Sequence, residues 1–304
     1  MPPSTTVTLF ETPRRRPRLP VFERAAQAPL MRLTDRDKRI LEAVHSFDGL
    51  LADYQIRALF FTGKTQMQIR TKLLFQHGYL ARPDRRRRAA LPCMVYWLTQ
   101  QGAAYIAGLA GQARQELVWR REPKWSQIEH DLSVNDLRIT IIQTCRATPA
   151  LTLEQWIPQS AFWAYPDTVE YVEPPGKTLK RRVRPDGYCV ISLHQKRFRL
   201  LWELDRRTED NPRFVREKVY PGLAYLRSAA YRQRFGYNAG KWLLVTTGER
   251  RLANMKRQTE QAVGRDAKVF YFTTLPQINP DTILTAPIWL RGGETMPRPL
   301  FTHL

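Results

Sequence analysis

Two apolar runs near the middle of the chain are framed by acids, and this pattern limits the possible folds more than any other. Residues 188–191 (YCVI) and 198–203 (FRLLWE) have the length and apolar content of strands, so residues 184–209 are predicted to form a β-hairpin. Asp186 precedes the first strand, and Glu203 and Asp205 close the second. Because side chains two apart on a strand share a face, Glu203 and Asp205 are expected to point the same way. Asp186 is expected to converge on them across the hairpin.

Three converging carboxylates repel one another unless a cation neutralises them. A cluster of carboxylate oxygens suits Mg²⁺ or Mn²⁺, and such a cation polarises a phosphodiester and lowers the pKa of a bound water. Two other interpretations stay open. In the first, Asp186 caps its own turn. In the second, Glu203 and Asp205 form ion pairs with arginines nearby in the sequence. An acid at the end of an apolar strand is costly unless it is paired or coordinated, so Glu203 is expected to have a positive partner.

The charge of the chain points to a polyanionic partner. Lys and Arg number 49 against 28 Asp and Glu, a formal charge of +21, which favours nucleic acid. An anionic membrane surface is the rival, but there is no run of about 18 apolar residues and no apolar signal-peptide segment. The cysteines Cys93, Cys145 and Cys189 are widely spaced, form no metal-binding pattern and fit a reducing compartment. We therefore expect a cytoplasmic protein without a membrane partner.

The length of 304 residues favours two domains. Residues 1–31 are rich in proline and arginine and are predicted to be a basic disordered arm, either solvated or lying on phosphates. Residues 113–125 are charged and irregular. They are predicted to link a first domain at residues 32–112 to a second at residues 126–304.

The first domain is predicted to contain three short helices followed by a hairpin. Apolar residues recur at helical spacing in 34–47, 52–61 and 65–76, and two short strands at 79–80 and 93–98 flank a run of four arginines. This order is that of a winged helix-turn-helix. In that fold the third helix enters the major groove and the wing touches the backbone or the minor groove.

The residue types at these two places fit DNA. Glutamine and arginine hydrogen-bond to base edges, and lysine and arginine neutralise phosphates. Any exposed helix or loop carries such residues, so a solvated surface is the alternative. The predicted DNA-binding residues are Lys64, Gln66, Gln68, Arg70 and Lys72 on the third helix and Arg85, Arg86, Arg87 and Arg88 at the turn of the wing.

The second domain is predicted to be α/β. Its elements follow the order helix, strand, hairpin, helix, strand, helix, strand, which implies a mixed central sheet with helices on its faces. Residues 165–182 are predicted to be an irregular loop, and residues 213–231 a helix that Pro221 kinks or divides.

Several segments, taken in order, resemble the replication-relaxation family over about residues 33–245. That family comprises proteins of plasmids and mobile elements, with a helix-turn-helix front and a C-terminal domain similar to the PD-(D/E)xK, or restriction-endonuclease-like, nuclease fold. The segments are LTDRDKRILEAV (33–44), FFTGKTQMQIRTKLLFQHGYL (60–80), YWLTQQGAAYI (96–106), EHDLSVND (129–136), RPDGY (184–188) and WELDRRTE (202–209).

The resemblance implies roles for the acids. Asp186 and Glu203 match the first and second acids of the nuclease pattern, and both would hold Mg²⁺ if the site is catalytic. The pattern's lysine, two residues after the second acid, is replaced by Asp205. Lys218 on the following helix is expected to reach back in its place. The catalytic candidates are Asp186, Glu203, Asp205 and Lys218, completed by Glu129 and His130.

Three functions follow from this pattern. The first is a DNA-binding protein of a plasmid or mobile element that recognises duplex DNA through its winged helix and acts in replication, transfer or regulation. The second is a Mg²⁺-dependent DNA endonuclease that uses Asp186 and Glu203. The third is an adaptor without catalysis that recruits a protein partner. Expected partners are double-stranded DNA, other proteins of the same element and a second copy of the chain.

Overall fold

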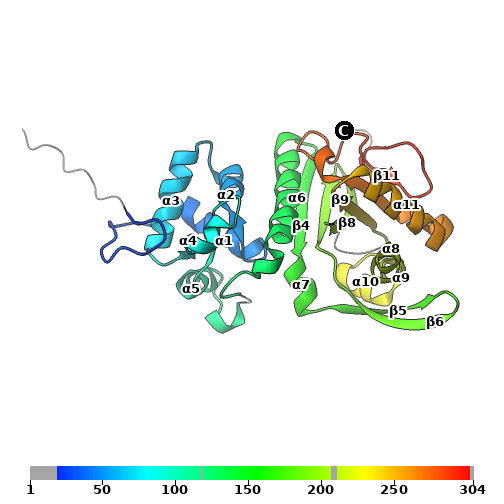
Figure 1. Ribbon diagram of the computed structural model, residues 1–304, viewed down its shortest axis with the longest axis horizontal. Coiled ribbons are helices and arrows are strands. Elements are labelled where there is room, and N and C mark those ends of the chain that lie inside the picture. Colours follow the sequence, from blue (N-terminus) through cyan, green and yellow to red (C-terminus); the bar gives the residue numbers. More distant parts are fainter. Residues whose placement is uncertain (1–18, 118, 207–210, 302–304) are drawn as a thin grey trace, which may run out of the picture.

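The computed structural model describes residues 19–117, 119–206 and 211–301. It places a helical N-terminal unit beside a larger α/β domain (Figure 1). Helix α1 begins after Thr34, whose hydroxyl accepts from the backbone of Asp37 while the Asp37 carboxylate accepts from the backbone of Thr34. The elements of this unit are α1 (Asp35–Ser46), β1 (Leu51–Ala52), α2 (Asp53–Phe60), α3 (Lys64–Gln76), β2 (Leu80–Ala81), α4 (Arg85–Ala89), β3 (Val95–Leu98), α5 (Gln100–Leu109) and η1 (Arg114–Glu116).

The three predicted helices and the two predicted strands are present. Strand β2 pairs antiparallel with β3, with Leu80 opposite Leu98, and β1 pairs with the other edge of β3. The connection between β2 and β3 differs from the predicted turn, because its arginines form the short helix α4. The Asp84 carboxylate caps this helix by accepting from the backbone N–H of Arg87 at 2.7 Å.

Helix α6 (Ile128–Ala147) belongs to the cores of both units. Its Ile139 packs with the N-terminal helices, whereas Val134, Leu137 and Ile141 pack on the six-stranded sheet of the second unit. In Figure 1 the helix lies between the two units. The predicted linker therefore does not separate the cores.

Buried hydrogen bonds strengthen this junction. The Gln55 amide donates to the carbonyl of Leu132 at 2.9 Å and to the Asp136 carboxylate at 2.7 Å. The Asn135 amide donates to the carbonyl of Leu50 at 2.8 Å. Separating the units would break these buried hydrogen bonds.

The second unit is built on a mixed six-stranded sheet in the order β11–β10–β9–β8–β7–β4, which confirms the predicted α/β class. Strands β7 and β8 form the predicted hairpin, and β9 runs parallel to both β8 and β10. One face is covered by α6 and the C-terminal segment with Trp289 and Phe301, and the other by η3, α9, α10 and α11. The elements are η2 (Trp125–Gln127), α6, β4 (Leu151–Pro158), α7 (Gln159–Ala164), β5 (Asp167–Glu173), β6 (Lys177–Val183), β7 (Gly187–Leu193), β8 (Lys196–Asp205), α8 (Asn211–Phe214), η3 (Val215–Val219), α9 (Tyr220–Arg227), α10 (Ala229–Phe235), β9 (Lys241–Thr246), α11 (Glu249–Val263), η4 (Gly264–Val269), β10 (Phe270–Thr274), η5 (Leu275–Gln277) and β11 (Leu290–Arg291).

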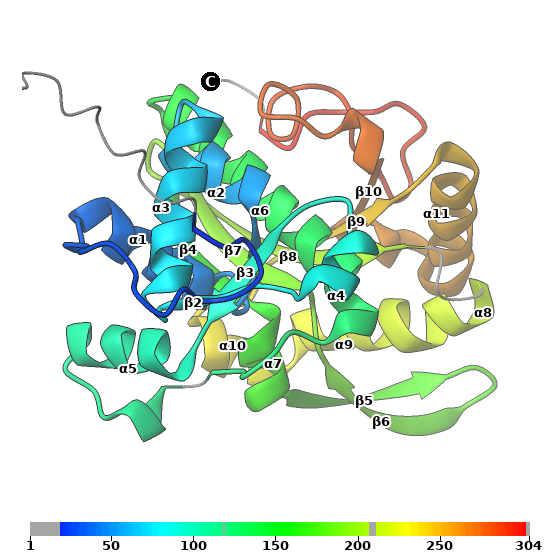
Figure 2. The same ribbon diagram turned by 60° about the vertical axis from the view of Figure 1, so that its left-hand side comes forward.

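The prediction of an irregular loop at residues 165–182 is wrong, because this segment forms the antiparallel hairpin β5–β6. Val169 and Tyr171 are buried while their neighbours on β5 are more exposed, the period-two pattern of a half-buried strand. This short alternation was not recognised in the sequence, because Pro174, Pro175 and several basic residues follow it. The hairpin extends away from the six-stranded sheet in both views (Figures 1 and 2).

The predicted helix at 213–231 is divided, but not at Pro221. A proline has no N–H to donate to the carbonyl four residues earlier, and the turn before Pro221 widens into the π-helix η3. The chain stays helical to Arg227 and breaks at Ser228, whose hydroxyl accepts from the Tyr231 N–H and caps α10.

Residues 1–18 of the predicted arm lie outside the described residues. The following stretch is held against the end of α3, where the Gln76 amide donates to the carbonyls of Pro20 and Glu23, both at 2.9 Å, and accepts from the Ala25 N–H. In the described ranges, no helix has the length and apolar character needed to cross a membrane.

Candidate functional site

A cavity of about 1430 Å³ lies where the N-terminal unit meets the second unit. The predicted acids Asp186 and Glu203 line it, together with the predicted Lys218 and His130. Its other charged lining residues are Arg87, Glu129, Lys180, Arg181, Arg182, Arg184, Asp205, Arg206, Arg213 and Glu217.

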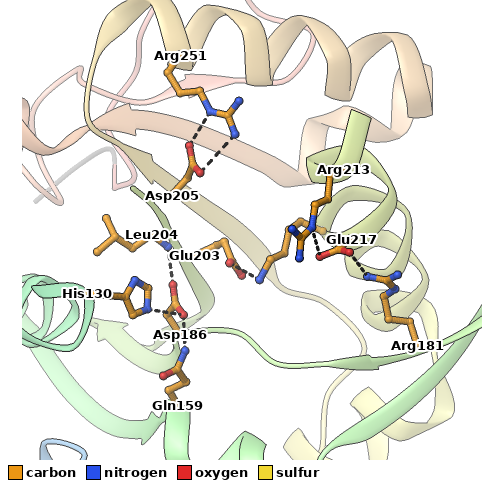
Figure 3. A network of polar contacts seen from close by, with 11 residues as sticks. His130, Gln159, Arg181, Asp186, Glu203, Leu204, Asp205, Arg213, Glu217 and Arg251 are labelled. Carbon is orange, nitrogen blue, oxygen red and sulfur yellow. Dashed lines mark hydrogen bonds and ion pairs between the residues drawn. The ribbon is translucent and has the colours of Figure 1, made fainter. Parts of the chain in front are cut away.

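Asp186 stands just before β7 and is only 3% exposed. Its Oδ2 accepts from the backbone N–H of Leu204 at 2.7 Å, which joins the start of one hairpin strand to the end of the other. Its Oδ1 lies 3.1 Å from Nε2 of His130 and accepts from the Gln159 amide at 2.7 Å (Figure 3). Asp186 is thereby held beside the end of β8, and three donors surround its carboxylate.

His130 and Asp186 form an ion pair within the second unit. Burial lowers the pKa of His130, but the charge and hydrogen bond of Asp186, together with the charges of Asp131 and Glu203, outweigh it, so the pKa is raised to about 9. Burial raises the pKa of Asp186, but the charge and hydrogen bond of His130, with smaller contributions from Lys218 and Leu204, hold it below its ordinary value. At neutral pH the pair is an imidazolium facing a carboxylate.

Glu203 lies near the end of β8 and is 7% exposed. The Lys218 ammonium is 2.5 Å from its Oε1. Lys218 lies in η3, the π-turn that precedes Pro221. The lysine that the resemblance expected to reach back does reach the second acid.

Asp205 has a different partner from the other two acids. Its Oδ2 accepts from Nε of Arg251 on α11 at 2.7 Å (Figure 3). The same oxygen accepts from the Thr246 hydroxyl at 3.3 Å. The position at which the nuclease pattern has a lysine thus carries a carboxylate held by an arginine of another helix. Arg251 was not among the predicted site residues, because it lies 46 positions along the chain from Asp205.

The acids and His130 are not grouped in the way that metal ligands are. Within the described ranges, no three His, Cys, Asp or Glu side chains are grouped so that they can hold a metal ion. Each predicted ligand already faces a cation of the protein, since His130 pairs with Asp186 and Lys218 with Glu203. A Mg²⁺ ion at Asp186 and Glu203 would have to compete with these two cations, and we derive no catalytic step through one.

The remaining predicted residue of this site lies on its rim. Glu129 is exposed and pairs with Arg206 at 2.7 Å. Gln159 on α7 contacts Asp186 directly but was not predicted, because nothing in its sequence surroundings marks it.

The predicted DNA-binding residues of α3 fall into two groups. Lys64, Gln66 and Gln68 are exposed, and Lys72 is half-buried. Arg70 donates to the buried carboxylate of Asp37 from Nε at 3.0 Å and ties α3 to α1. Its guanidinium is thus used inside the N-terminal unit, an assignment that the sequence did not suggest.

The predicted arginine run also divides. Arg85, Arg86 and Arg87 are exposed, whereas Arg88 is half-buried and donates to the carbonyl of Leu91 at 2.6 Å. Arg87 lines the same cavity as Asp186 and Glu203. The arginine helix α4 therefore borders the acids of the second unit.

The family model described as replication-relaxation matches residues 41–236, more than half of the 304-residue chain. No curated protein and no solved structure matches significantly.

Proposed function

Because the chain belongs to the replication-relaxation family, we propose that it is a DNA-binding protein of a plasmid or mobile element. It would recognise duplex DNA through its N-terminal unit and act in replication, relaxation, transfer or regulation of that element. In this proposal the N-terminal unit is a winged helix-turn-helix, with α3 as the recognition helix and β2–α4–β3 as the wing.

The observation that carries the proposal is the pairing of two exposed polar surfaces on one small unit. Lys64, Gln66 and Gln68 are exposed along the first turns of α3, where a recognition helix contacts base edges. Arg85 and Arg86 are exposed on α4, and these cations suit phosphates. The formal charge of +21 supports the same partner.

Substitutions on the two surfaces test the proposal. The double variant Arg85→Ala/Arg86→Ala should weaken binding to all duplex sequences alike, whereas Gln66→Ala or Gln68→Ala should change the preferred sequence. The matched control is Arg250→Ala/Arg257→Ala on α11, which removes two exposed arginines far along the chain. Selection from a random duplex pool, followed by fluorescence anisotropy, gives both readouts. Equal losses in the wing variant and in its control would contradict the proposed surface.

Cleavage of DNA is the second candidate. The observation that favours it is that Asp186, Glu203 and Lys218 line one cavity, as the nuclease resemblance predicts. The test is nicking of supercoiled plasmid with Mg²⁺ or Mn²⁺. Nicking should be lost in Asp186→Ala and Glu203→Ala while duplex binding is kept. A wild-type protein that binds DNA but never nicks it with either metal would exclude this candidate.

The remaining predictions from the sequence concern binding partners and cellular location. A homodimer, other proteins of the same element and a cytoplasmic location remain part of the proposal. Failure to bind any duplex at low salt would leave the adaptor hypothesis as the better account.

A further inference from the structure

The cavity between the units carries features that duplex recognition by α3 does not use. Its volume of about 1430 Å³ exceeds the roughly 300–1,000 Å³ of ordinary small-molecule sites. Both units supply its walls, with Arg87 from α4 and Arg182 and Arg184 from the end of the β5–β6 hairpin. A ligand that fills it must therefore be long or branched and must tolerate a cationic wall.

Several donors in the wall of the cavity have no acceptor among the residues that the structure describes. Arg182 and Arg184 form no ion pair within the described part of the chain, although most other basic side chains of the cavity are paired with acids. The buried Nε of Arg184 and the buried indole Nε1 of Trp125 have no hydrogen-bond partner among the described residues. These two atoms are fully buried and do not meet a ligand directly. Because Arg182 and Arg184 have no acid partner in the described ranges, their guanidinium groups point to an acceptor-rich ligand such as a phosphodiester strand.

Two tryptophans accompany these donors, each with an arginine over its ring. The Arg184 guanidinium lies 3.9 Å from the ring centroid of Trp163, and that of Arg87 lies 4.8 Å from Trp125. Trp163 is 44% exposed, which is unusual for so large an apolar side chain lining a cavity. Arginines beside an exposed indole are the combination that holds an unpaired strand, because bases stack on the ring and phosphates meet the cations.

We propose that this cavity binds an unpaired DNA strand, with a base against Trp163 and phosphates against Arg182 and Arg184. The base must be unpaired, because inside a duplex both of its faces are covered by neighbouring pairs and cannot meet an indole. The strand then passes Asp186 and Glu203, which line the same cavity. The inference rests on the proposed function in taking DNA as the ligand, and it adds a second, single-stranded site to the duplex surface of α3.

The experiment compares short fluorescein-labelled oligo-dT with a labelled duplex by anisotropy at low salt, using the full chain. Trp163→Ala should weaken oligo-dT binding about 5- to 150-fold, the range typical of removing one stacked base, and should change duplex binding less than about two-fold. Trp163→Phe keeps an aromatic face and should retain most of the affinity for oligo-dT. The double variant Arg182→Ala/Arg184→Ala should also weaken oligo-dT binding and lower its salt dependence.

The chain offers a matched control for the tryptophan. Tyr237 is 47% exposed and has the Arg199 guanidinium 3.7 Å from its ring centroid, but it does not line this cavity. Tyr237→Ala should therefore bind oligo-dT as the wild type does. Thermal melts of all variants show whether each is folded. If Trp163→Ala is not folded, the double variant Arg182→Ala/Arg184→Ala provides the test of the site.

The outcomes separate this inference from the proposed function. If Trp163→Ala binds oligo-dT as tightly as the wild type, or is weakened no more than Tyr237→Ala, the single-strand site is refuted while duplex binding stands. Equal weakening on oligo-dT and duplex would also refute it, since this would indicate one shared surface. Tighter binding of oligo-U than of oligo-dT would overturn the assignment to DNA. If neither oligo-dT nor duplex binds at low salt, the proposed function falls as well.

Discussion

The ion pair between His130 and Asp186 makes the stability of the protein depend on pH in a defined direction. The pKa of His130 is raised from 6.5 to about 9 in the folded chain. A raised pKa means that the folded state holds the proton more tightly than the unfolded state does. The stabilisation is therefore complete below about pH 6.5 and is lost as the pH rises through about 9.

The size of the effect follows from the shift. Each pKa unit corresponds to about 1.4 kcal/mol, so a rise from 6.5 to about 9 gives an upper figure of about 3 kcal/mol at low pH. The imidazole is 27% exposed and the carboxylate 5% exposed, so solvent screens the pair only in part. Asp131 and Glu203 also contribute to the raised pKa of His130, and the energy of the pair is not counted a second time for Asp186.

The perturbation is His130→Gln, whose amide can still donate to Asp186 but carries no charge. Urea unfolding in EDTA should show the wild type more stable than the variant by about 2–3 kcal/mol at about pH 6. The difference should shrink toward a small constant at about pH 10, where the wild-type histidine is neutral. Adding Asp186→Asn completes a double-mutant cycle that isolates the pair.

A control histidine separates this pair from general effects of pH. His194 is exposed in the turn between β7 and β8 and has φ of 52°. Asparagine tolerates that conformation, so His194→Asn should leave the pH dependence of unfolding unchanged. A wild-type advantage over His130→Gln that is constant with pH, or that grows as the pH rises, would refute the assigned ion pair.

Three further substitutions test the structure directly. Arg70→Ala should destabilise the N-terminal unit by about 3 kcal/mol because it leaves the buried Asp37 carboxylate without its ion pair. The control Lys64→Ala should leave the melting temperature unchanged. Equal melting temperatures in the two variants would contradict the ion pair between Arg70 and Asp37. Gln55→Ala should lower the free energy of unfolding by about 1–3 kcal/mol because it removes a donor from Asp136 and from the carbonyl of Leu132. Calorimetry should still show one unfolding transition, since α6 is shared by both cores. Two separated transitions would contradict the shared core. Asp205→Lys restores the residue of the nuclease pattern but places a cation against Arg251. It should therefore destabilise the protein by several kcal/mol without raising nicking activity above that of the wild type. A stable variant with higher activity would show that the nuclease pattern, and not the ion pair, governs this position.

The three acids show which parts of the candidate site could be predicted from the sequence. The hairpin and the approach of Asp186 to the end of β8 were predicted, because strand alternation and a short connection fix them locally. The reach of Lys218 to Glu203 was implied by the family resemblance. The argument that buried acids need cations also holds. The cations are side chains, however: His130, Lys218 and Arg251 serve Asp186, Glu203 and Asp205 respectively.

The parts that the sequence missed depend on contacts between distant segments. Arg251 meets Asp205 only because β9 brings α11 to the end of β8. Arg70 was assigned to DNA because an arginine on a polar helix face looks the same whether it meets solvent or, as here, Asp37. The role of α6 in two cores was hidden for a similar reason, since its apolar residues serve two partners on different sides and give no single stripe.

The most direct test of the central claim is the salt dependence of duplex binding. A chain that neutralises about six phosphates should show a slope of log affinity against log salt of about −5. The double variant Arg85→Ala/Arg86→Ala should flatten that slope by about two, one for each phosphate that the variant no longer neutralises. A slope near zero in the wild type would contradict the account of this chain as a DNA-binding protein.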